Sequence, residues 1–127
     1  MEKYIERAHE VYRILKKDLT SRQNKILNYC VEKVQPGDTP TTEYEISISG
    51  ICNACGIAID DEGQFIETLE DELGVLARPT WLELKHSDEM IRAFYDLWIN
   101  PITDRLGFTF HEQFMHYLQF GKFQEEC

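Results

Sequence analysis

Two cysteines three positions apart, Cys52 and Cys55, have the spacing of half a zinc site. Two thiolates at this spacing can grip one ion, but a closed structural site needs two further ligands. Cys30, His86 and Cys127 are the candidates to complete it, and none of them forms a second pair. Free cysteine is among the most buried residue types. We therefore expect Cys52 and Cys55 to be core residues and the protein to have no cofactor, with zinc as the less favoured alternative.

The other residues with chemical potential do not indicate an enzyme. His111 and His116 are five positions apart, a spacing that does not place two ligands on one helical face. The sequence contains no recognisable Ser/His/Asp or Cys/His set, no glycine-rich phosphate loop and no carboxylate pair with an evident pocket. We expect a protein without catalytic activity.

The distribution of charge is the most informative feature of the sequence. The chain has 127 residues and a formal net charge of −10. Residues 34–77 contain no Lys, Arg or His, whereas residues 1–33 contain more bases than acids. The base-free stretch carries the carboxylates Asp38, Glu43, Glu45, Asp60, Asp61, Glu62, Glu67, Glu70, Asp71 and Glu72. A run of like charge is often only a solvated surface, so its place in the fold decides what it can do.

The first half of the chain reads as two helices, a strand and a short helix. Apolar stripes predict amphipathic helices over residues 2–17 and 20–34, the second opened by a capping box of Thr20 and Gln23. Residues 44–48 alternate apolar and polar side chains, as a half-buried strand does. Ser47 is a good N-cap for a short helix, and Gly56 follows it where a positive φ is needed.

The second half reads as a long helix, a small sheet and a closing helix. The helix is predicted between an acidic turn at residues 60–63 and Pro79, and Glu67, Glu70 and Asp71 face away from its apolar stripe. Three strands are predicted within residues 81–84, 90–99 and 108–110, forming one antiparallel wing. A last helix is expected around residues 114–118.

This order predicts an α+β fold: a single winged-helix domain of about five helices with a small antiparallel sheet. Its predicted parts are an N-terminal helix (1–18), a helix-turn-helix core (19–79), a wing (80–110), and a closing helix and tail (111–127). The charged N-terminus has no apolar run long enough for a signal peptide or a membrane span. We expect a cytoplasmic protein that does not bind membranes.

Residues 19 to about 123 resemble the N-terminal winged-helix domain of Rep-type plasmid replication initiators. The resemblance is carried by Leu19-Thr20-Ser21-Arg22-Gln23, Tyr44-Glu45-Ile46-Ser47, Cys55-Gly56-Ile57, Pro79-Thr80-Trp81-Leu82 and the later Phe110 with Tyr117-Leu118. It implies a domain of an initiator that dimerises or contacts DNA. Such initiators have two tandem winged helices, and the second is expected to make much of the origin contact.

The acidic stretch falls where a winged helix normally meets DNA. The helix after the turn enters the major groove and needs Lys or Arg to neutralise phosphates. Here it carries Asp60, Asp61, Glu62, Glu67, Glu70, Asp71 and Glu72 on the helix and its approach, and no base. We therefore expect this surface to bind not DNA but a protein with a basic nucleic-acid-binding groove.

Three functional hypotheses follow. The first is a stand-alone acidic winged helix, derived from a replication initiator, that inhibits a nucleic-acid-handling protein by imitating DNA, as anti-CRISPR proteins do. The alternative is the dimerisation or DNA-binding domain of an initiator, with DNA contacted by the basic cluster of Lys16, Lys17, Arg22 and Lys25. A third is a regulatory dimer with no nucleic-acid partner. The sequence leaves a homodimer open in each case.

Overall fold

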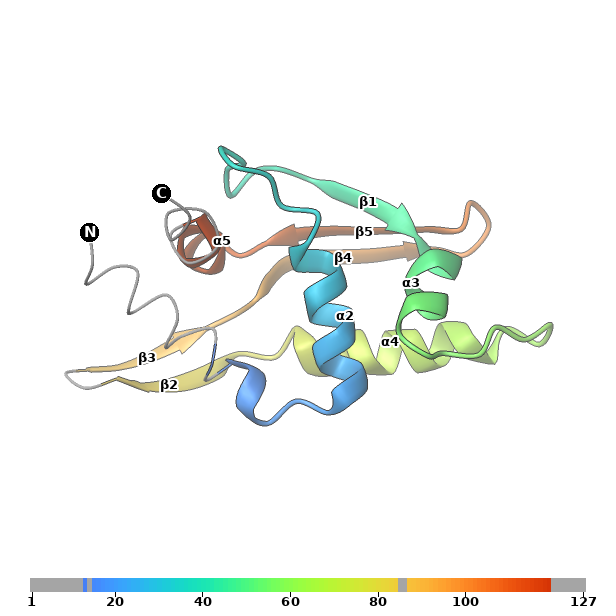
Figure 1. Ribbon diagram of the computed structural model, residues 1–127, viewed down its shortest axis with the longest axis horizontal. Helices are drawn as coiled ribbons and strands as arrows, with labels where there is room; N and C mark the ends of the chain where they lie inside the picture. Colours follow the sequence, from blue (N-terminus) through green and yellow to red (C-terminus); the bar gives the residue numbers. More distant parts are fainter. Residues whose placement is uncertain (1–12, 14, 85–86, 120–127) are drawn as a thin grey trace.

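A three-stranded antiparallel sheet with the strand order β1-β5-β4 lies against a group of helices, and a separate hairpin projects from this body (Figure 1). The computed structural model describes residues 13, 15–84 and 87–119. The described elements are α2 (Ser21–Val31), β1 (Tyr44–Ser47), α3 (Ile48–Ala54), α4 (Gln64–Leu76), β2 (Thr80–Leu84), β3 (Ser87–Ile91), β4 (Phe94–Asn100), β5 (Arg105–Phe110) and α5 (Glu112–Leu118). This is an α+β winged-helix fold, as predicted.

Local signals in the sequence place the ends of the helices. In α2 the amide of Gln23 donates to Thr20 Oγ1 (3.1 Å) and the amide of Thr20 donates to Gln23 Oε1 (3.0 Å), which confirms the capping box. Ser47 Oγ accepts from the amide of Gly50 (3.0 Å) at the start of α3. Gly56 follows α3 with a φ of 76°, the left-handed conformation that glycine adopts without strain.

The core lies between the sheet and the helices. On the inner face of the sheet, the ring of Tyr44 stacks on Phe108 (5.1 Å between centroids) and that of Phe94 on Phe110 (5.2 Å). Both contacts join residues that are partners across neighbouring strands. Phe110 also contacts Phe114 of α5, so the aromatic cluster ties the closing helix to the sheet. From the helices, the buried apolar side chains include Ile26, Leu27, Ile48, Ile51, Leu69 and Leu73.

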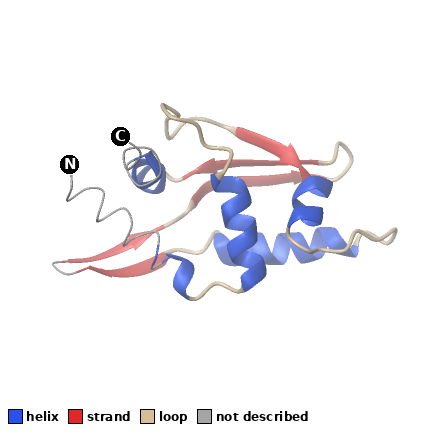
Figure 2. Cartoon of the chain, viewed as in Figure 1, coloured by secondary structure: helices blue, strands red, loops and turns tan. Residues whose placement is uncertain are grey.

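The predicted wing is wrong in its strand pairing. β2 pairs with β3 in a hairpin of its own, whereas β4 pairs with β5, and β1 completes the three-stranded sheet (Figure 2). The stretch predicted as one strand over residues 90–99 is divided between β3 and β4. The division falls at Arg92 and Ala93. The carbonyl of Ala93 accepts from the amide of His111 (2.9 Å), which continues the pairing of β4 with β5 by one residue pair.

Two predicted segments can be followed only in part. Residues 15–17 are helical and belong to the helix predicted over residues 2–17, most of which lies outside the described residues. The predicted tail lies beyond residue 119, also outside them. In the part of the chain that is described, no helix is long and apolar enough to cross a membrane.

Candidate protein-interaction surface on α4

Three of the seven carboxylates predicted to bind a partner lie on the open side of α4. Glu67, Glu70 and Asp71 are exposed, while Leu69 and Leu73 on the opposite side are buried in the core. We call these three carboxylates the acidic face. Amphipathic spacing explains the arrangement, because a helix buries every third or fourth residue and leaves the others to solvent.

The turn before α4 adds further acidic residues, with different roles. Asp61 and Glu62 are exposed at the turn, which extends beyond the ends of α3 and α4 in Figure 1. Asp60 is partly buried, and its Oδ1 accepts from the amide of Phe65 (3.2 Å). Gly63, at the N-cap position, has no side chain to perform this capping, so Asp60 supplies it. Glu72 is also partly buried.

A groove of about 320 Å³ opens between α4 and β4. Glu70 lines it together with the apolar side chains of Leu73, Ala77, Leu97 and Ile99, and with Trp98. Gly74 of α4 also borders the groove, and a Cβ built there would have no atom within 4 Å. The groove therefore adjoins the acidic face and has one charged residue in its lining.

The indole ring of Trp98 lies over Gly107 of β5. It is the cross-strand partner of Gly107, and a Cβ at Gly107 would overlap the indole ring. The ring thus occupies the space that any other residue at position 107 would need. Trp98 remains 45% exposed.

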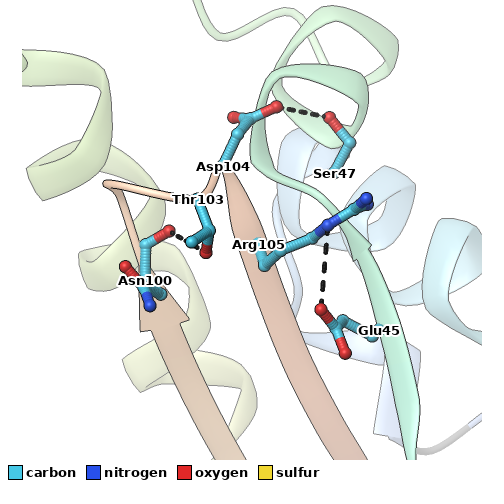
Figure 3. A network of polar contacts seen from close by, with 6 residues as sticks. All are labelled: Glu45, Ser47, Asn100, Thr103, Asp104 and Arg105. Atoms are coloured by element: carbon cyan, nitrogen blue, oxygen red, sulfur yellow. Dashed lines mark hydrogen bonds and ion pairs between the residues drawn. The ribbon is translucent and has the colours of Figure 1, made fainter.

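The turn between β4 and β5 is fastened to the start of α3 (Figure 3). Asp104 Oδ2 accepts from the hydroxyls of Ser47 (2.8 Å) and Ser49 (2.6 Å), and its Oδ1 accepts from the amide of Ser49 (3.0 Å). The carbonyl of Asp104 accepts from the amide of Ile48 (3.0 Å). The hydrogen bonds from Ser49 and Ser47 hold the pKa of Asp104 below its usual value.

Sequence reasoning missed this fastening. Four groups near the start of α3, two hydroxyls and two backbone amides, converge on one residue far along the chain. Nothing in the spacing of Ser47, Ser49 and Asp104 indicates that they meet. On the neighbouring strands Arg105 Nε lies 3.7 Å from Glu45 Oε1. This ion pair is exposed, so it contributes little to the stability of the fold.

Two of the four basic residues proposed to contact DNA are partly buried or bonded to other parts of the protein. Lys17, Arg22 and Lys25 are exposed, but Arg22 Nη2 donates to the carbonyl of Gly56 (3.4 Å), just beyond α3. Lys16 is only partly exposed, and burial lowers its pKa. Lys17 and Lys25 are therefore the members best placed to meet a phosphate.

The cysteine pair lies inside the molecule. Cys52 and Cys55 are buried, as is Cys30 on α2. Burial, with smaller contributions from the nearby Cys55 and Asp104, raises the pKa of Cys52 to about 11, so its thiol stays protonated at neutral pH. Among the described residues no three His, Cys, Asp or Glu side chains are grouped as metal ligands would be. His86 and Cys127, proposed above as further ligands, lie outside the described residues.

The histidines of the closing helix take structural and surface positions. His111 precedes α5, and its Nδ1 accepts from the amide of Gln113 (3.4 Å), as an N-cap does. His116 is exposed.

Comparison with known proteins agrees with the architecture. Residues 6–122 match the family model described as "Initiator Replication protein, WH1". No curated protein matches the sequence. Among solved structures, the fold is similar to the WH1 domain of MSBI1.176, a replication protein isolated from a multiple sclerosis patient. The TM-score is 0.50 at 12% identity, over 82% of this chain and 86% of that one.

Proposed function

The chain belongs to the WH1 family of initiator replication proteins, and from that premise we propose that it acts by binding another protein through the acidic face of α4. In a winged helix, α4 is the helix that follows the turn and would enter the major groove of DNA. Here it presents Glu67, Glu70 and Asp71 to solvent. This is the observation that carries the proposal, because each carboxylate would repel a phosphate backbone.

The chemistry of the partner follows from the same charges. A surface of clustered carboxylates attracts basic surfaces and orients them during association. Many basic grooves in proteins bind nucleic acid. In its sharpest form the proposal is therefore that this protein occupies such a groove on a nucleic-acid-handling protein and inhibits it as a DNA mimic.

Charge reversal of the acidic face tests the proposal. Glu67→Lys, Glu70→Lys and Asp71→Lys together leave the buried stripe of Leu69 and Leu73 intact, so the fold should survive. A matched control reverses three exposed carboxylates elsewhere, with the same change in net charge: Glu32→Lys, Glu43→Lys and Asp96→Lys. Both variants and the parent would be used to capture proteins from a lysate of the cells that produce this protein.

The expected result is a partner that the parent and the control retain and the α4 variant loses. Its affinity would then be measured with purified components at several salt concentrations, and it should fall as salt rises. Equal binding by all three proteins would show that the acidic face is only a solvated surface.

The second candidate is the initiator function that the family description names. Family membership favours it, and Lys17 and Lys25 are exposed on the first part of the chain. In that function DNA would be contacted there and not by α4. Binding of the parent to duplex DNA, lost on Lys17→Gln and Lys25→Gln, would favour this candidate.

A further inference from the structure

The β4–β5 turn, residues 101–104, presents an apolar side chain at its apex. Ile102 is 95% exposed, and the next most exposed large hydrophobic side chain among the described residues is Tyr95 at 75%. Unlike Tyr95, Ile102 has no polar atom in its side chain. Pro101 beside it is also exposed. The fold gains little from an isoleucine at this position, because an apolar side chain stabilises a protein by being buried.

Single exposed apolar residues are common on protein surfaces, but this one is carried by a backbone that is fixed at several points. The amide of Ile102 donates to Asn100 Oδ1 (3.2 Å), and the amide of Asp104 donates to the carbonyl of Pro101 (3.3 Å). The ring of Pro101 sets its own φ, and the carboxylate of Asp104 fastens the turn to α3. The turn therefore presents Ile102 without the entropy cost of ordering a flexible loop on binding.

The β4–β5 turn lies at the same end of the molecule as the start of α4. Ile99 of β4 and Glu70 of α4 line one groove, so the two elements lie side by side. β4 ends where α4 begins along the long axis of the molecule, and the acidic turn at residues 60–63 projects at this end too (Figure 1). Glu67 belongs to the first turn of α4. A partner that covers the acidic face can therefore contact the apex of the β4–β5 turn as well.

We propose that Ile102 anchors the protein partner of the acidic face by inserting into an apolar pocket with basic residues at its border. The proposal rests on the proposed function, which supplies the partner and its basic surface. The pocket is apolar because the apex offers Pro101 and Ile102, and its border is basic because this end of α4 carries carboxylates.

The minor groove of DNA, which apolar wedges also enter, suits this apex less well. Residues 101–104 contain no Lys or Arg, and Arg105, which follows them, is paired with Glu45. The carboxylates at the start of α4 would repel the phosphates on either side of the groove. Charge therefore favours a protein over DNA as the occupant.

Photocrosslinking in the cells that produce this protein locates the contact. The photoreactive residue p-benzoylphenylalanine replaces Ile102 in the full chain. In a matched variant it replaces Met90, an exposed apolar residue of β3, which lies at the opposite end of the molecule (Figure 1). The expected result is a crosslink from position 102, and none from position 90, to a protein whose crosslinked segment is apolar with Lys or Arg beside it.

The affinity for the crosslinked protein, once identified and purified, tests whether Ile102 is an anchor. Ile102→Ala should weaken binding by about 10- to 60-fold and Ile102→Val by about fourfold, in proportion to the apolar carbons removed. The control Met90→Ala should bind as the parent does. Because the lost contact is apolar, the loss should be similar at every salt concentration, whereas reversal of the acidic face should change the salt dependence. Thermal unfolding of Ile102→Ala should be unchanged, since the side chain is almost fully exposed.

Three outcomes would overturn the inference. The first is a crosslink from position 102 that is no stronger than that from position 90, which would mean that the apex meets no partner. The second is a crosslink to DNA that nuclease removes, which would also favour the initiator function. The third is an Ile102→Ala variant that binds the partner as tightly as the parent. The first and third leave the proposed function standing, because that function fails only if the triple reversal of the acidic face retains the partner.

Discussion

Asp104 shows how one residue can serve both a turn and a distant helix. Among the described residues it is the one non-glycine with a positive φ, 56°. Aspartate and asparagine tolerate this conformation better than most residues because their short polar side chains can hydrogen-bond locally. Here the carboxylate bonds to α3 instead, so the turn conformation and the start of a remote helix depend on the same side chain.

Replacing Asp104 should therefore loosen the turn and α3 together. We expect Asp104→Ala to lower the free energy of unfolding by about 1–2 kcal/mol, a reduced value for hydrogen bonds to a charged group because the carboxylate is only partly buried. Asp104→Asn keeps an acceptor and the tolerance for positive φ, so it should lose less. Urea unfolding of the three proteins at neutral pH measures the differences.

Acid should remove the stabilisation that the Asp104 carboxylate provides. The pKa of Asp104 is lower in the folded chain than its ordinary value of 3.8. A lowered folded pKa gives stability that is fully present above 3.8 and is lost as the pH falls through the folded pKa. The difference in the free energy of unfolding between the parent and Asp104→Ala should thus narrow below pH 3.8. A gap that stays constant into strong acid would contradict the role assigned to the carboxylate.

The buried thiols lead to a prediction about metal. Cys52 and Cys55 face the core, and the raised pKa of Cys52 disfavours the thiolate that zinc binds. Treatment with a chelator should leave the midpoint of thermal unfolding unchanged. Stoichiometric zinc in protein purified without added metal, with unfolding on chelation, would instead make these cysteines structural ligands.

At the scale of elements, the sheet depends on a close pair between β4 and β5. Trp98 covers Gly107, so Gly107→Ala should displace the indole and cost roughly 1–3 kcal/mol, as overpacking does. The displaced ring should also change the tryptophan fluorescence. Gly74→Ala is the contrasting change, since its Cβ meets no atom, and it should stabilise α4 by about 0.5–1 kcal/mol. Equal effects of the two substitutions would mean that Trp98 is not held on Gly107.

The helices could be predicted from the sequence because their signals are local. Thr20 and Gln23 form the predicted capping box, Ser47 caps α3, and the stripe of Leu69 and Leu73 faces the core. Each of these signals spans only a few residues, so neighbouring side chains are enough to reveal it.

The sheet could not be predicted in the same way. β1 pairs with β5, some sixty residues later, and the alternation of apolar residues in a strand does not say which strand is its partner. The apolar run over residues 90–99 also lacks a Gly or Pro where β3 ends and β4 begins. In the candidate site, exposure of Glu67, Glu70 and Asp71 followed from periodicity, whereas the groove required the unpredicted position of β4 beside α4.

For the whole molecule, the charge distribution predicts weak interaction with nucleic acid. At physiological salt the protein should show no measurable affinity for duplex DNA of random sequence, because nonspecific binding requires phosphate neutralisation by Lys and Arg. The triple reversal of the acidic face removes three acids and adds three bases, and it should gain salt-sensitive binding. Mobility shifts at micromolar protein over a range of salt test both statements. A salt-sensitive shift of the parent protein would favour the initiator function.

The pairing of β1 with β5 also affects how the chain folds as it leaves the ribosome. β1 is made well before Arg105–Phe110, so its hydrogen-bonding edge has no strand partner while the intervening residues are synthesised. The hydroxyls of Ser47 and Ser49 likewise cannot bond to Asp104 until that residue has been made. Until then Ile46, Ile48 and Ile51, which are buried in the folded chain, lack the part of the core that later residues supply, and they are accessible to chaperones. β5 must therefore leave the ribosome before the three-stranded sheet can form, and a chain stalled before β5 is made would leave the edge of β1 unpaired.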